Sequence, residues 1–152
     1  MGDAPARLGR RTATRPRRPK ATRLMLVVDP TIVLPILAAK PAWMSAGSDD
    51  LVAPPLLWSE CRSLLHDLAR RGVIPTAEAR RMRRALDRAP ITELSHPQLG
   101  EESWRVADLL NHPRTEAAEY VALARLIGAP LATLDRDLAE RAAIVCRVEV
   151  PD

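Results

Sequence analysis

The sequence predicts an α/β fold in which helices cover both faces of a mostly parallel sheet. Short apolar segments of strand length alternate with helical patterns from residue 24 to residue 150, which is typical of βαβ units. The chain has 152 residues, enough for one domain with its own core. It contains no GxGxxG or Walker sequence, so a nucleotide-cofactor fold is not supported.

The first predicted strand covers residues 24–29. Leu24–Val28 is a short apolar run, and Pro30 cannot donate to a sheet ladder, so the strand should end there. A short helix is expected over 31–39, with Pro35 kinking or delaying it.

A strong helix is expected from Pro55, after a loop over 40–50 and a short strand over 51–54. Arg70, Arg71 and Gly72 should end it. Its apolar residues recur at spacings of three and four, which places them on one face: Leu57, Cys61, Leu64, Leu65 and Leu68.

The second half of the chain continues the alternation. Thr76 should cap a helix that reaches Leu86, and Thr115 should cap a helix over 116–127 that ends at Gly128. The other expected elements are a strand over 91–94, a helix over 98–110 with Leu99, Val106, Leu109 and Leu110 inward, a strand over 131–134, a helix over 136–142 and a strand over 147–150.

The net charge of +4 is unevenly distributed. Residues 1–23 carry eight Lys or Arg and one acid, which leaves 15 basic and 18 acidic residues, a net charge of −3, in residues 24–152. We expect a disordered basic extension followed by one domain over 24–152, because the extension has almost no large apolar residue. The extension could contact nucleic acid phosphates non-specifically; alternatively it is an unselected extension, with Met25 as a natural start.

Several classes of site and location are not supported. The two cysteines form no CxxC or Cys/His cluster, and the three histidines are scattered, so neither a zinc site nor a disulfide framework is expected. No apolar run approaches membrane-spanning length, and the N-terminus lacks the apolar region of a secretory signal. The sequence therefore predicts a cytoplasmic protein.

Asp29 is the first candidate functional residue. It stands alone among apolar neighbours at the carboxyl end of a predicted strand, where ligand sites lie in open α/β sheets. It is also in position to cap the helix that follows. Asp135 likewise follows an apolar strand, so both aspartates should lie along one edge of the sheet.

Further carboxylates are expected near this edge. Glu60 is one turn into its helix, Glu116 and Glu119 are three apart in the first turn of another, and Asp137 follows Asp135 by two. Oxygen ligands without His or Cys suit Mg²⁺ or Mn²⁺, and the reaction that fits is phosphodiester hydrolysis. The alternative is that each acid only caps or decorates a helix.

Together these segments resemble PIN-domain proteins, and within them the VapC-type toxin ribonucleases of toxin–antitoxin systems. The resemblance covers residues 24–150 and is carried by VVDPTIVLPIL, LVAPPLLWSECRSLL, RRGVIPTAEARRMRRAL, EYVALARLIGAPLATLDRDLA and RVEVP. It implies a three-layer α/β/α fold, Mg²⁺-dependent (or Mn²⁺-dependent) endoribonuclease activity on RNA and a VapB-type antitoxin that covers the acidic site. A homodimer is a further expectation.

The resemblance also assigns roles. Asp29, Glu60 and Asp135 match the first, second and fourth acids of the family, and Thr31 the Ser or Thr often found near the first. The third acid of the family falls on Ala117. Glu116, one residue earlier and about 100° round the helix, is the candidate substitute; Glu119 is on nearly the opposite face, and Asp137 could contribute directly or through water.

Two other functions remain open. The Ala117 departure would fit a PIN-like protein that binds RNA or its antitoxin without cleaving, and solvated acids would fit a non-nuclease interaction domain. Trp43, Trp58 and Trp104 are expected to pack in the core rather than to stack on RNA, because no basic residues interleave with them.

Overall fold

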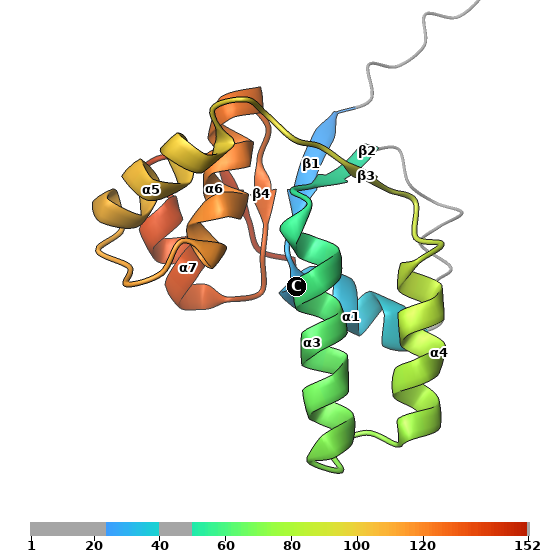
Figure 1. Cartoon of the computed structure of the whole chain (residues 1–152). Coiled ribbons are helices and arrows are strands. Elements are labelled where there is room, and N and C mark those ends of the chain that lie inside the picture. Colours follow the sequence, from blue (N-terminus) through green and yellow to red (C-terminus); the bar gives the residue numbers. More distant parts are fainter. Residues whose placement is uncertain (1–23, 40–49, 152) are drawn as a thin grey trace, which may run out of the picture.

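The computed structural model describes residues 24–39 and 50–151 (Figure 1). The expectations for the basic extension 1–23, for most of the loop 40–50 and for Trp43 lie outside these residues. The elements are β1 (Met25–Val28), α1 (Pro30–Ala38), β2 (Asp50–Ala53), α3 (Leu56–Arg70), α4 (Thr76–Leu86), β3 (Ile91–Glu93), α5 (Leu99–Leu109), α6 (Glu116–Ile127), β4 (Leu131–Ala132), α7 (Arg136–Ala142) and β5 (Val148–Glu149).

The sheet has five strands in the order β3-β2-β1-β4-β5, and every neighbouring pair is parallel. Figure 1 shows α5, α6 and α7 on one side of the strands and α1, α3 and α4 on the other. The predicted α/β fold, with helices on both faces of the sheet, is therefore confirmed. Element boundaries differ from the predicted ones by no more than two residues, the usual uncertainty at element ends.

The chain reverses its direction of travel across the sheet at β1. From β1 it proceeds to β2 and β3 on one side, and then to β4 and β5 on the other. The carboxyl ends of β1 and β4 therefore lie at a topological switch point, where open α/β sheets bind ligands. Val28 lies opposite Ala132 in the parallel register, so the next residues, Asp29 and Thr133, follow side by side.

The core lies between the sheet and its helices. α6 contributes a continuous buried run from Tyr120 to Ala124, and the predicted core residue Cys61 is fully buried on α3. No helix in the part of the chain that the structure describes is both long and apolar enough to cross a bilayer.

Several local predictions are wrong. Thr76 is the first residue of α4, not its cap. Thr115 is at the N-cap position of α6 as expected, but its side chain makes no capping hydrogen bond. Leu64 and Leu109 are exposed by 40% and 51%, because they lie at the margins of their apolar faces, beyond the reach of the neighbouring elements. The prediction that the tryptophans pack in the core is confirmed for Trp58, which packs against it, and wrong for Trp104, which is 68% exposed.

Candidate metal centre

Asp29 both caps a helix and lies at the switch point. Its extended backbone ends β1, and Pro30 begins α1 at a position where the missing N–H has no cost. Asp29 Oδ1 accepts hydrogen bonds from the backbone N–H groups of Thr31 (2.9 Å) and Ile32 (3.2 Å). Its exposed fraction is only 3%. The capping interpretation is therefore confirmed, and the carboxylate is also held in a buried position at the sheet edge.

Two threonine hydroxyls hold the same carboxylate. Thr31 Oγ1 donates to Asp29 Oδ1 at 2.5 Å, and Thr133 Oγ1 donates to Asp29 Oδ2 at 2.5 Å. Burial is the largest influence on the pKa of Asp29 and raises it. The hydrogen bonds from Thr133 and Thr31 oppose this rise, but the pKa stays above its usual value. These donors stabilise the charged form of Asp29 against the cost of burial.

The two threonines also connect the ends of β1 and β4. Thr31 Oγ1 accepts from the backbone N–H of Leu134 at 2.7 Å, and Thr133 Oγ1 accepts from that of Asp135 at 3.0 Å. Asp135 is exposed, and its Oδ1 caps α7 by accepting from the N–H of Leu138 at 3.0 Å. Asp29 and Asp135 therefore share Thr133 as a neighbour, but Asp135 directs one oxygen to its own helix.

Glu60 is directed from α3 towards α6. Its Oε2 accepts a hydrogen bond from the hydroxyl of Tyr120 at 2.6 Å. Burial raises the pKa of Glu60 most; the Tyr120 bond lowers it, and the negative charges of Asp29 and Glu116 raise it further. Glu60 on α3 therefore feels the charges of Asp29 at the start of α1 and of Glu116 on α6.

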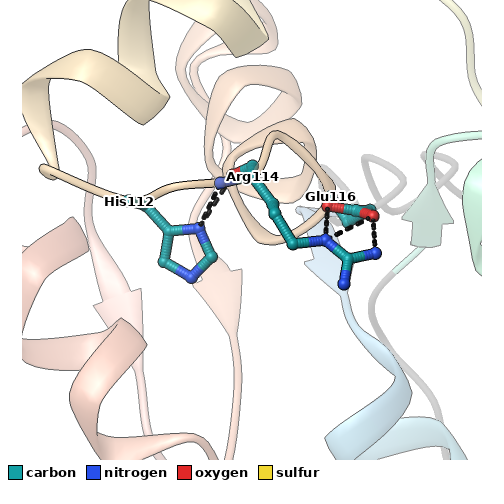
Figure 2. A network of polar contacts seen from close by, with 3 residues as sticks. All are labelled: His112, Arg114 and Glu116. Atoms are coloured by element: carbon teal, nitrogen blue, oxygen red, sulfur yellow. Dashed lines mark hydrogen bonds and ion pairs between the residues drawn. The ribbon is translucent and has the colours of Figure 1, made fainter.

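The start of α6 adds two more carboxylates. Arg114 Nε donates to both oxygens of Glu116, at 3.0 and 3.2 Å, and Arg114 Nη2 also bonds Glu116 Oε1 (Figure 2). The bond from Arg114 holds the pKa of Glu116 below its usual value. Glu119 is half-buried, and its pKa is raised by burial, then by the charges of Glu60 and Glu116. Ala117, between them, packs against the core.

The acids do not form a ready-made metal cage. Within residues 24–39 and 50–151, no group of three or more His, Cys, Asp or Glu side chains is arranged so that it could hold a metal ion. The oxygens of Asp29, Glu60 and Glu116 are directed to threonine, tyrosine and arginine donors. Asp137 is exposed and pairs with Arg141 at 3.1 Å.

The chemistry of the donor set nevertheless fits a hard divalent cation. All candidate donors are carboxylate or hydroxyl oxygens, which Mg²⁺ and Mn²⁺ prefer. Burial raises the pKa of Glu60 and Glu119 most, and neighbouring carboxylates raise both further. A cation at this edge would relieve that repulsion. To ligate one, these side chains would have to exchange some of their present hydrogen-bond partners.

Comparison with known proteins is consistent with this architecture. No family model and no curated protein matches the sequence. Among solved structures, PAE2754 from Pyrobaculum aerophilum, a PIN-domain protein, matches with a TM-score of 0.67 at 24% identity, over 84% of this chain and 91% of that one. This chain has a PIN-domain fold. VapBC-1 from nontypeable Haemophilus influenzae matches with a TM-score of 0.57 at 14% identity, over 84% of this chain and 98% of that one.

The resemblance to PIN-domain proteins is thus confirmed at the level of the fold, including its three layers. The switch point of the PIN fold carries the expected acids Asp29 and Asp135 at the ends of adjacent strands. Thr31, expected beside the first acid, donates its hydroxyl to it.

Three residues at the site were missed in the sequence. Thr133 had a signal, because it is a polar residue inside a predicted apolar strand, two positions before Asp135. Tyr120 is the only tyrosine of the chain, and a buried tyrosine hydroxyl usually has a partner. No pattern in the sequence pointed to Arg114, because its pairing with Glu116 depends on how the chain turns before α6.

Proposed function

We propose that this chain is the toxin of a VapBC-type toxin–antitoxin system and acts as a metal-dependent endoribonuclease. The observation that supports this most is the buried, hydrogen-bonded Asp29 at the switch point of a PIN fold, close enough to Glu60 for its charge, with that of Glu116, to raise the pKa of Glu60. A buried carboxylate is costly, and a helix cap alone requires no burial.

The proposed ligands of Mg²⁺ or Mn²⁺ are Asp29, Glu60 and Asp135, with Glu116 in place of the third family acid and Asp137 as an outer contributor. When bound, such a cation polarises a phosphoryl oxygen and lowers the pKa of a water. The protein's own residues prepare the site: Thr31 and Thr133 fix the carboxylate of Asp29, and Tyr120 fixes that of Glu60. The raised pKa of Glu60 allows it to hold or release a proton closer to neutral pH than an ordinary glutamate does.

The proposed partners follow from the same family. A VapB-type antitoxin would cover the acidic edge and keep RNA out of it. A homodimer is part of this proposal, as is a cytoplasmic location, where the RNA substrate is found.

Replacing Asp29 by Asn tests the proposal. Asn keeps the size of the side chain but removes the charge that a cation needs, so Asp29→Asn should abolish RNA cleavage and growth arrest. Asp67→Asn is the matched control, because Asp67 lies outside the proposed ligand set, is exposed and pairs with Arg71 one helical turn away; it should cleave RNA at the wild-type rate. Cleavage of RNA at the wild-type rate by folded Asp29→Asn would contradict the assignment.

A second function is favoured by Ala117 and by the absence of a three-ligand group in the described residues. In that case the chain is a PIN-like protein that binds RNA or its antitoxin without cleaving. Titration with Mn²⁺ in a calorimeter separates the two functions: heat of binding that disappears in Asp29→Asn supports the nuclease, whereas a silent titration supports the second function.

A further inference from the structure

The ion pair between Arg114 and Glu116 places a cation of the protein itself at the acidic edge. The guanidinium reaches both oxygens of Glu116 (Figure 2), in the two-pronged geometry that Arg forms with carboxylates. The positive charge of Arg114 also acts on Glu60 and opposes the rise of its pKa. Arg114 therefore pairs directly with the carboxylate of Glu116 on α6 and acts on Glu60 of α3 only through its charge.

The backbone around Arg114 supports this placement. His112 Nδ1 contacts the Arg114 carbonyl oxygen at 2.7 Å and its N–H at 3.3 Å, so a local turn presents Arg114 to the start of α6. The side chain of Arg114 is 74% exposed and that of Glu116 39% exposed. The pair is thus accessible to ions and can open without disturbing the core.

We propose that Arg114 is an internal counter-ion that competes with a divalent metal ion for Glu116. This inference rests on the proposed function, since it assumes a metal at the acidic edge. While the pair is closed, both oxygens of Glu116 are engaged by the guanidinium. Removal of Arg114 frees this carboxylate and removes one positive charge that repels the metal.

The test is Mn²⁺ binding by calorimetry on the full chain without RNA. Arg114→Gln should bind Mn²⁺ about two- to fivefold more tightly, the range that an exposed ion pair represents, and the gain should shrink at high salt. Arg147→Gln is the matched control, because Arg147 is also 74% exposed and pairs with Glu149, whose side chain is 41% exposed. It should leave the affinity unchanged.

A second variant shows whether Glu116 mediates the effect. If Arg114 competes for this carboxylate, the double variant Arg114→Gln/Glu116→Gln should bind Mn²⁺ no more tightly than Glu116→Gln alone. The inference would be overturned by tighter Mn²⁺ binding in the double variant than in Glu116→Gln, by an equal gain in Mn²⁺ affinity in Arg147→Gln, or by no gain in Arg114→Gln. RNA cleavage by the wild type and Asp29→Asn is measured separately, so the proposed nuclease can stand when this inference fails.

Discussion

The most informative single perturbation is Thr133→Val, because it removes one hydroxyl and almost nothing else. Thr133 is fully buried, and valine has nearly the same shape, so no cavity forms. The change deletes the 2.5 Å bond to Asp29 Oδ2 and the acceptor of the Asp135 N–H at 3.0 Å. It therefore measures how much the hydrogen bonds of the Thr133 hydroxyl, which connect the ends of β1 and β4, contribute to the free energy of folding.

The expected loss of folding free energy is about 2–3 kcal/mol at pH 7. A hydrogen bond to a charged group contributes about 1.5–3 kcal/mol, and the 3% exposure of Asp29 means that water does not replace the lost donor. The Asp135 N–H adds little, since Asp135 is exposed and water can bind there. For a domain of this size, each kcal/mol lowers Tm by about 3–5 °C.

The loss should depend on pH in a definite direction. Burial raises the pKa of Asp29 above its usual value, and the Thr133 bond opposes that rise; valine therefore raises it further. The folded state then holds a proton that the unfolded state has released, so stability falls as the pH rises between the two pKa values. Because this window is wider in the variant, the difference from wild type should be larger at pH 7 than at pH 4.

Urea unfolding followed by circular dichroism at both pH values measures this difference. Thr133→Ser keeps the hydroxyl and should lose only about 1 kcal/mol for the methyl group. Thr92→Val, at an exposed position of β3, should have little effect. A loss in Thr133→Val no greater than in Thr92→Val, or one that is larger at pH 4, would refute the reasoning.

Three further predictions concern single side chains. Gly128 has φ +66 and open space where a Cβ would lie, so Gly128→Ala should cost about 1–2 kcal/mol of unfolding free energy from backbone strain alone. Gly100→Ala, without positive φ on α5, should instead stabilise by about 0.5–1 kcal/mol; thermal melts that rank the two alike would contradict this. Burial raises the pKa of the Cys61 thiol to about 12, so mass spectrometry should find it unmodified by iodoacetamide at pH 8 until urea is added. Tyr120→Phe removes the bond that lowers the pKa of Glu60, and an NMR titration of that carboxyl should show a higher midpoint than in wild type.

The alternation of apolar strands and amphipathic helices was enough to predict the fold class and nearly all the elements. These features depend on residues close in sequence: the run before Pro30, the spacing of apolar residues on α3, and Gly128 after α6. The position of Asp29 and Asp135 at the ends of strands was predictable for the same reason, because parallel strands joined by crossovers end on one edge.

The exposure of individual side chains was less predictable. Leu64 and Leu109 belong to apolar patterns but are exposed, since a helical face is buried only as far as its neighbours extend. No periodicity in the sequence contains that information.

The sequence by itself therefore determined where the acids stand in their own elements, because caps, strand ends and helical faces are local. Only the tertiary structure decided which distant groups they meet: Thr133 lies 104 positions from Asp29, and Tyr120 lies 60 positions from Glu60. The physical reason is that such partners depend on strand order and helix packing, which bring together residues that no local pattern relates.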